Sequence, residues 1–350
     1  MKFNYSLNHN EVFVIAEAGS NWKVGTYDQD IQRAQELIKA AAHAGADAIK
    51  FQTYNAASVY SENAGKSNYL SKQGITENVE EIFDKYSMPY DMIPKLAKMC
   101  NDQKIEFMST PFSVEDAKQI DPFVLIHKIA SFEINHIRLL EFLAKTGKPL
   151  LISTGASTMS EIEFAIDICK KNGNNKITLL QCTSKYPAPL SSMNLSVIKK
   201  LKNKFDIPVG FSDHSIEPII APLLSISYGA SVIEKHFTLD KKLPGPDHSF
   251  ALEPNEFKQM RDVVKNALSI IGTGIKDVQD DEIELRQFAK RSLQAIKDIK
   301  KGEFLQEGVN FDVLRPGNNS RGLDPKFLKE CDGKRVKSDI KKGEGITEYE

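Results

Sequence analysis

Eight short segments rich in β-branched and aromatic residues recur along the chain, and this repetition is what most constrains its fold. They span residues 12–18, 48–53, 105–110, 124–131, 149–154, 177–182, 208–213 and 231–237. Helix-like segments separate most of them, and in 29–45 and 160–173 the apolar residues recur with a helical period. Strands that alternate with helices favour a parallel sheet. Eight such units over about 270 residues predict a closed (β/α)₈ barrel.

The alternative architecture is a doubly wound open sheet, but no Gly-x-Gly-x-x-Gly motif follows the first strand. In the helix predicted over 160–173, Ser160 is the expected N-cap and Gly173 lies just past the expected end. The largest insertion, residues 54–104, contains a polar stretch at 61–74 that predicts a long loop.

The character of the chain changes after a helix predicted near 254–271. The Gly- and Asp-rich stretch that follows predicts a linker. Beyond it the string DIKKGE occurs twice, at 298–303 and 339–344, which indicates two related β-structured halves of a small domain. The predicted organisation is a catalytic barrel over 1–271, a linker over 272–282 and a small β-rich domain over 283–350.

Charge and composition exclude several classes of protein. The chain has 46 basic and 47 acidic residues and a net charge of −1, which argues against a nucleic-acid binder. No apolar run approaches the ~18 residues of a membrane span, and the N-terminal apolar segment is too short for a secretion signal. The four cysteines show no Cys-x-x-Cys spacing, so we expect buried free thiols and a reducing, cytoplasmic setting.

Polar residues gather where the predicted strands end. Barrel enzymes carry their active sites at the C-terminal ends of the strands. The candidates there, in chain order, are Glu17, Lys50, Gln52, Ser109, Thr110, Lys128, Ser131, Ser153, Thr154, Gly155, Thr183, Ser184, Tyr186, Ser212, Asp213, His214, Glu234 and His236.

Lys50 and Lys128 lie inside strands that should be almost wholly apolar. Burying an unpaired ammonium costs on the order of several kcal/mol, so each lysine needs a partner. One interpretation is a pair with a glutamate at the end of the first or the eighth strand. The other is that both lysines face an anion. With the hydroxyls of Ser153 and Ser212 nearby, that anion would be a phosphate.

His214 and His236 end two neighbouring strands on the predicted active face. Either could be an ordinary strand-end histidine. As a pair with oxygen donors they suit a divalent Mn, Zn, Co or Fe ion, and without an evident third ligand the site would be open and able to polarise a carbonyl. Glu17 could pair with Lys50, or act as a general base or position a water molecule.

Together these residues resemble the sialic acid synthase family, which condenses phosphoenolpyruvate with an N-acylated amino sugar. The resemblance covers essentially the whole chain in order, and the tail is similar to the antifreeze-like (SAF) domain of these enzymes. The matching pieces are IAEAGSN (15–21), GADAIKFQT (45–53), STPF (109–112), KIASFE (128–133), STG (153–155), CTSKYPAP (182–189), GFSDHS (210–215), VIEKHFTLD (232–240), GPDHSF (245–250) and RPGNN (315–319).

The resemblance implies a role for each residue. His214 and His236 would hold Mn²⁺ or Mg²⁺, and Glu17 would be the principal catalytic carboxylate. The implied partners are small molecules and a second copy of the chain in a domain-swapped homodimer, with no nucleic acid and no membrane. Phosphoenolpyruvate would be bound by Lys50, Lys128, Ser131, Ser153, Ser184 and Ser212. The sugar would be bound by Gln52, Thr110, Tyr186, Asp247, Phe288 and Arg315, of which Arg315 comes from the partner's small domain.

The sugar itself stays open at this point. Many family members have Asn where Ser184 stands, the piece KIASFE resembles the pseudaminic acid branch, and GPDHSF resembles the N-acetylneuraminate and legionaminate branches. A barrel of the 3-deoxy-octulosonate 8-phosphate or DAHP synthase type is the alternative enzyme, but no spare basic cluster offers a second phosphate site. A carbohydrate-binding or scaffold protein would leave the lysines and histidines unexplained.

Overall fold

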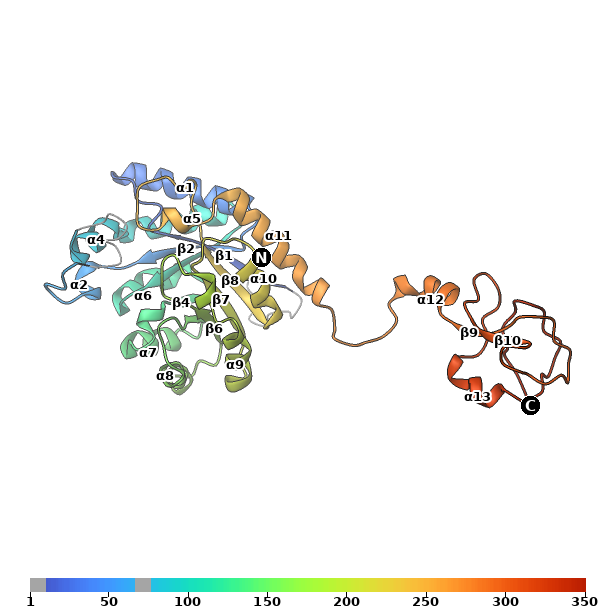
Figure 1. Ribbon diagram of the computed structural model, residues 1–350. Helices are drawn as coiled ribbons and strands as arrows, with labels where there is room; N and C mark the ends of the chain where they lie inside the picture. The colour runs from blue at the N-terminus through green and yellow to red at the C-terminus, as the bar shows by residue number, and fades with distance from the viewer. Residues whose placement is uncertain (1–10, 67–76) are drawn as a thin grey trace. The chain divides into compact units, whose positions relative to one another are not determined.

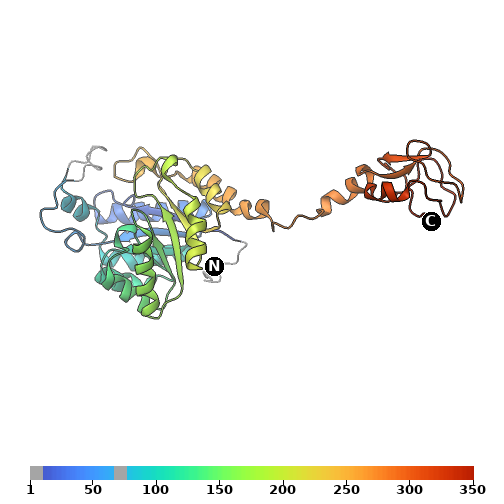
Figure 2. The same ribbon diagram turned by 60° about the horizontal axis from the view of Figure 1, so that its bottom comes forward.

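The computed structural model describes residues 11–66 and 77–350, which form two compact units divided between Gly272 and Thr273. The first unit is a parallel eight-stranded barrel surrounded by helices, and the helices lie outside the strands in both views (Figure 1 and Figure 2). No helix among the described residues is long and apolar enough to cross a membrane.

The eight strands follow one another around the barrel. Their hydrogen-bonded order is β3-β2-β1-β8-β7-β6-β5-β4, and β3 and β4, at the two ends of this order, lie next to each other. The strands are β1 (Phe13–Gly19), β2 (Ala48–Thr53), β3 (Glu106–Pro111), β4 (His127–Ile129), β5 (Leu150–Ser153), β6 (Ile177–Cys182), β7 (Val209–Asp213) and β8 (Ala230–His236).

Helices connect the strands, and most of them bury one face against the barrel. In α1 (Tyr27–His43) that face consists of Ala34, Leu37, Ile38 and Ala41, and the helix begins with a capping box between Thr26 and Gln29. The other helices of this unit are α2 (Ala56–Val59), α4 (Val79–Tyr86), α5 (Ile93–Asp102), α6 (Val114–Ile120), α7 (Ile137–Lys145), α8 (Met159–Lys171), α9 (Ser196–Phe205), α10 (Ile220–Ser227) and α11 (Pro254–Ile271).

The inward side chains of the barrel form two layers, because alternate residues of a strand point to the same face. The layer nearer the strand starts, which we call the apolar layer, is Ile15, Ala48, Met108, Ile126, Leu151, Leu180, Gly210 and Val232. Two residues further along the same strands lies the polar layer, Glu17, Lys50, Thr110, Lys128, Ser153, Cys182, Ser212 and Glu234.

Gly210 shows how tightly the apolar layer is packed. A Cβ at this position would lie 2.5 Å from Leu180 Cδ2 and 2.6 Å from the carbonyl oxygen of Val232. Any side chain would therefore collide with backbone. A larger cluster of apolar residues fills the space between the strands and the helices.

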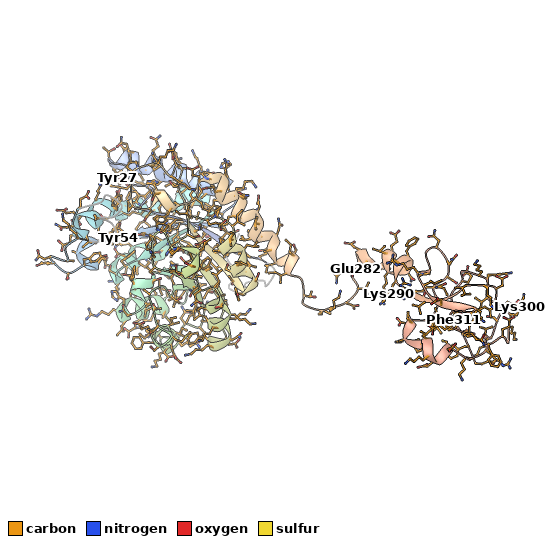
Figure 3. The ribbon with its side chains drawn as sticks, viewed as in Figure 1. Tyr27, Tyr54, Glu282, Lys290, Lys300 and Phe311 are labelled. Carbon is orange, nitrogen blue, oxygen red and sulfur yellow. The ribbon has the colours of Figure 1, made fainter. Side chains whose placement is uncertain are left out.

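The second unit is small and held by its own core. It contains α12 (Ile283–Ala289), β9 (Ser292–Ala295), β10 (Phe311–Leu314) and α13 (Leu328–Cys331), with β9 and β10 antiparallel. Phe311 lies inside this unit and Lys300 at its periphery (Figure 3).

The two DIKKGE copies pair with each other in the second unit. Ile299 and Ile340 form an antiparallel bridge. Asp339 accepts hydrogen bonds from Lys300 Nζ and Lys301 N, both at 2.9 Å. In turn, Asp298 accepts hydrogen bonds from the second copy, from Lys341 Nζ at 3.4 Å and Lys342 N at 2.9 Å.

The predicted fold class, an eight-stranded barrel with a small β-containing C-terminal unit, is confirmed. The segment predicted as a strand over 124–131 is shorter, because the chain turns into a 3₁₀ helix at Ser131–Glu133. The predicted N-cap Ser160 is wrong: Thr158 caps α8 through a capping box with Glu161. The loop predicted over 61–74 has no helix or strand in its described part, and 67–74 lie outside the described residues.

Candidate active site

Glu17 lies two residues before the end of β1, with its carboxylate turned into the barrel and only 1% of the residue exposed. Its Oε2 lies 2.5 Å from Lys50 Nζ, and Gln52 Nε2 donates to its Oε1 at 3.0 Å. Burial raises the pKa of Glu17 to about 7, and Lys50 limits the rise. A carboxyl with this pKa exchanges its proton near neutral pH, as a general base or acid must.

The two buried lysines share a second carboxylate. Lys50 Nζ and Lys128 Nζ each lie 3.7 Å from Glu234 Oε1, and Lys50 also donates to Thr110 Oγ1 at 3.0 Å. Burial alone would raise the pKa of Glu234, but the ammonium groups of Lys128 and Lys50 lower it below its ordinary value. Burial lowers the pKa of Lys128. The interpretation that each lysine pairs with a barrel carboxylate thus matches the ligand-free geometry.

The balance of charge still favours an anion in this layer. Two lysines face two glutamates, and Glu17 loses its charge below a pH of about 7. When Glu17 is protonated, Lys50 and Lys128 share a single negative charge on Glu234. An anion that entered the polar layer would restore neutrality.

Four serine hydroxyls lie in and around the polar layer. Ser153 Oγ and Ser184 Oγ have no hydrogen-bond partner among the described residues. Ser131 Oγ accepts from Gly155 N at 2.9 Å, and Ser212 Oγ donates to Glu234 at 3.3 Å.

Gly155 allows these groups to converge. A Cβ at Gly155 would overlap Ser184 Oγ and come within 2.8 Å of Ser131 Oγ and 3.0 Å of Cys182 Sγ. Buried polar atoms are normally paired, so the unpaired hydroxyls indicate an oxygen-rich ligand.

His214 and His236 meet edge to face, with their ring centroids 5.4 Å apart. Nδ1 of His214 lies 2.9 Å from the carbonyl oxygen of Thr183. A carbonyl only accepts hydrogen bonds, so Nδ1 carries a proton and Nε2 is the ring nitrogen left to bind a ligand. Such a hydrogen bond from the second ring nitrogen is typical of histidines that bind metals.

His236 is also suited to ligation. Burial and the nearby positive charges hold its pKa well below the ordinary value, so the ring is neutral. Its buried Nδ1 has no hydrogen-bond partner among the described residues. The two imidazoles therefore fit a divalent cation with an open coordination sphere. In the described part of the chain, no group of three or more His, Cys, Asp and Glu is arranged to enclose a metal.

Aromatic rings flank the histidine pair. The ring of Tyr186 stacks on His214 with centroids 4.2 Å apart, and Phe250 lies 4.9 Å from His236. These two aromatic rings restrict the movement of both imidazoles. Tyr186 thereby joins the cluster to the loop that follows β6.

Asp247 joins the site from the loop after β8. Its Oδ2 accepts from Ser20 N at 3.1 Å and from Ser20 Oγ at 2.8 Å. A Cβ on Gly19 would lie 2.7 Å from Asp247 Oδ2 and 3.5 Å from Glu17 Oε1, and Gly19 has a φ of +51°. Burial raises the pKa of Asp247.

Phe288 and Arg315 belong to the second unit. Phe288 is half exposed on α12 and Arg315 is exposed directly after β10. The carbonyl oxygen of Phe288 accepts from Gly317 N at 3.0 Å, which joins α12 to the turn after Arg315. The end of α12 and the turn after Arg315 therefore lie side by side in the small unit.

The structure gathers most of the candidate residues in and around the polar layer of the barrel. The gathered residues are Glu17, Lys50, Gln52, Thr110, Lys128, Ser131, Ser153, Ser184, Tyr186, Ser212, His214, His236 and Asp247.

One carboxyl is missing from the sequence-based set. Glu133 is partly exposed, yet its Oε2 is buried with no hydrogen-bond partner among the described residues, and burial raises its pKa to about 7. The signal that the sequence offered for Glu133 was its position two residues after Ser131.

Comparisons with known proteins identify the family of this chain. Residues 37–276 match the NeuB family and residues 290–348 match the SAF domain. Pseudaminic acid synthase of Campylobacter jejuni is 39% identical over 97% of this chain and 96% of its own length. N,N'-diacetyllegionaminic acid synthase of the same organism is 38% identical over 97% of this chain and 99% of its own length.

A solved structure is similar as well. The N-acetylneuraminic acid synthetase of Leptospira borgpetersenii, crystallised with citrate, is 36% identical with a TM-score of 0.70. The match covers 79% of this chain and 92% of the other. On the strength of the family match and these relatives, the chain belongs to the NeuB family.

Proposed function

We propose that this protein condenses phosphoenolpyruvate with an N-acylated amino sugar to give a nonulosonic acid and phosphate. The observation that carries the proposal is the polar layer, in which two buried lysines and unpaired hydroxyls lie beside a histidine pair. The relatives named as pseudaminic and legionaminic acid synthases support the same class of product.

Phosphoenolpyruvate binds through its negative charges. Lys50 and Lys128 supply point charges and the serines donate hydrogen bonds to the phosphate and carboxylate oxygens. The unpaired Ser153 and Ser184 hydroxyls support this role, because they need an acceptor that the protein does not provide. Ser131 and Ser212 complete the cradle after rotating away from their present partners.

His214 and His236 hold a divalent ion, Mn²⁺ or Mg²⁺. When bound, the ion supplies Lewis acidity that polarises the aldehyde of the open-chain sugar. The neutral ring of His236 and the hydrogen bond from His214 to Thr183 support this assignment. Tyr186 keeps the His214 ring in its plane by stacking.

The chemistry joins C3 of phosphoenolpyruvate to the aldehyde carbon of the sugar. Water then adds at C2, and the C–O bond to phosphate breaks as phosphate leaves. Of the two protons of that water, one ends on the new hydroxyl of the sugar and the other on phosphate. Glu17, with a pKa of about 7, takes a proton from that water, and Lys50 and Gln52 hold its two oxygens in place. The largest reduction of the activation free energy comes from charged groups that are already in place around the reacting atoms.

The sugar contacts Gln52, Thr110, Tyr186 and Asp247 of its own barrel. Two copies of the chain form a domain-swapped homodimer in which the partner subunit's Arg315 meets the N-acyl group and the partner subunit's Phe288 packs on its methyl. The hydrogen bond between Phe288 and the turn after Arg315 supports their acting together.

Phosphate release from phosphoenolpyruvate tests the function. The purified protein is assayed with N-acetylmannosamine, its 6-deoxy diacetamido analogue and the altrose analogue, with arabinose 5-phosphate as control. We expect metal-dependent release with one of the three amino sugars. Release with arabinose 5-phosphate alone would contradict the proposal, since it would make the chain a different type of condensing barrel.

Mixed dimers test the swap. Arg315→Ala and Glu17→Ala subunits are inactive separately, but each mixed dimer should regain one intact site. Recovery to about one quarter of wild-type activity is expected when the subunits exchange at random. A mixture that recovers nothing after verified exchange would argue against the swapped arrangement.

A further inference from the structure

Lys235 is a fully buried lysine that the proposed chemistry does not use. It lies on β8 between Glu234 and His236, which point into the barrel, so its own side chain points outward. The residue is only 1% exposed, among the apolar side chains between the barrel and the helices. An ammonium in such surroundings is costly unless it is well paired.

Four oxygens surround its Nζ. Asp213 Oδ2 lies at 2.7 Å, and the backbone oxygens of Ser215 and Glu217 lie at 2.6 and 3.0 Å. Ser215 Oγ is at 3.0 Å. All four acceptors belong to residues 213–217, the segment that leaves β7.

This segment contains His214, and Lys235 is the immediate neighbour of His236. Asp213 and Lys235 are also partners in the β7–β8 register. The second oxygen of Asp213 accepts from Ser215 N at 2.8 Å, so the turn after His214 is built around the Asp213–Lys235 pair. Lys235 thus ties the segment that carries one histidine to the strand that carries the other.

We propose that Lys235 is a positioning residue that fixes His214 against His236 and thereby sets the affinity of the pair for a divalent cation. The inference rests on the proposed role of the two histidines. Lys235 touches neither substrate nor cation, because its side chain lies on the opposite face of β8 from His236.

The ammonium matters here more than the bulk of the side chain. A methionine would fill a similar volume but would donate no hydrogen bonds to the carbonyls of Ser215 and Glu217. The turn would then have to find other donors, and His214 would lose its fixed direction. With only two protein ligands, the site depends strongly on the orientation of each.

Mn²⁺ binding to the substrate-free protein, measured by titration calorimetry, tests the inference. We expect Lys235→Met to weaken Mn²⁺ binding by about 10- to 100-fold, the usual effect of losing a group that orients a metal ligand. Circular dichroism and thermal unfolding report whether the variant is folded.

Two further variants separate positioning from folding. Lys235→Met combined with Asp213→Asn removes the buried unpaired carboxylate but keeps the acceptor for Ser215 N, and it should also bind Mn²⁺ at least tenfold more weakly. Lys265→Met is the matched control. It breaks the 2.9 Å pair with Asp47, which accepts from Val14 N at the opposite end of the barrel, and should leave Mn²⁺ binding unchanged.

The outcomes distinguish this inference from the proposed function. If wild type binds Mn²⁺, His214→Ala does not, and both Lys235 variants bind within twofold of wild type, only the positioning role is overturned. If neither Lys235 variant folds while Lys265→Met does, Lys235 serves the fold alone and the inference is also overturned. If Mn²⁺ binding survives His214→Ala, the metal assignment fails, and the role of Lys235 fails with it.

Discussion

The two layers inside the barrel are equally buried but differ completely in chemistry. The apolar layer packs aliphatic side chains around Gly210, whereas the polar layer holds two lysines and two glutamates two residues further along the same strands. Hydrophobic burial makes the first layer favourable by itself. The second layer contains charged side chains, whose burial is costly. It also contains the Ser153 hydroxyl, which has no hydrogen-bond partner among the described residues. A shift of two residues along each strand therefore separates the layer that stabilises the fold from the layer that reacts.

The largest effect should come from the carboxylate of the polar layer. Glu17→Gln keeps the shape and an acceptor for Gln52 but cannot take a proton. We expect kcat to fall by about 10²- to 10⁴-fold, the usual contribution of general acid–base catalysis. The measurement is phosphate release at saturating substrates. A variant that kept more than half of the wild-type kcat would show that Glu17 takes no part in the chemistry. The polar layer would then not differ from the apolar layer in its role.

A substitution in the apolar layer should act on stability instead. Leu151→Ala removes a fully packed side chain below Ser153, and we expect the free energy of unfolding to fall by about 2–5 kcal/mol. The affinity of the folded protein for phosphoenolpyruvate should change less than threefold. Urea unfolding and ligand titration measure the two quantities. Unchanged stability with lost binding would reverse the roles assigned to the layers.

The pH dependence of stability should also separate the layers. The pKa of Glu17 is about 7 in the folded protein and near 4.5 when unfolded. The folded state therefore binds the extra proton between these values, and its stability falls as pH rises through this window. Between pH 5 and pH 8 the loss specific to Glu17 should be on the order of 2–3 kcal/mol.

Urea unfolding of wild type and Glu17→Gln at both pH values measures this loss. Other buried carboxyls are present in both proteins, so the difference between their pH profiles reports Glu17 together with its electrostatic effect on Glu234. Leu151→Ala, the matched control from the apolar layer, should keep the wild-type profile at lower stability. Identical profiles for wild type and Glu17→Gln would mean that Glu17 is ionised throughout.

The smallest effect should come from a single unpaired hydroxyl. Ser153→Ala removes a group that has no partner among the described residues, so stability should be unchanged or slightly higher. The KM for phosphoenolpyruvate should rise about 10-fold, the lower end of the range for one hydrogen bond to a charged group. Thr178→Ala, on the neighbouring strand and outside the polar layer, serves as the control. Equal KM values for both variants would exclude Ser153 from the phosphate cradle.

Much of the barrel could be predicted because its signals are local. Each strand is a short β-rich run, and the predicted bounds of 48–53 and 177–182 coincide with β2 and β6. Lys50 and Lys128 stood out because a charged residue is anomalous in a buried strand. The capping box that begins α8 was equally local, and its Thr-x-x-Glu pattern could have been preferred to Ser160.

What could not be predicted depends on contacts between distant segments. That Lys50 and Lys128 share Glu234 follows from how three strands meet, which no single strand encodes. The raised pKa of Glu133 arises from burial, which the surrounding elements create. Nor does any local pattern indicate that Lys235 would bind the segment after β7, since its partners lie about 20 residues earlier.

The reciprocal pairing of the two DIKKGE copies has a consequence for folding of the small unit. Each aspartate binds the lysine segment of the other copy, and the copies are 41 residues apart. Neither half can complete its turn until the intervening chain has closed into a loop, which costs entropy before any contact repays it. The unit should therefore fold in a single cooperative step, and only when both copies are present in the chain.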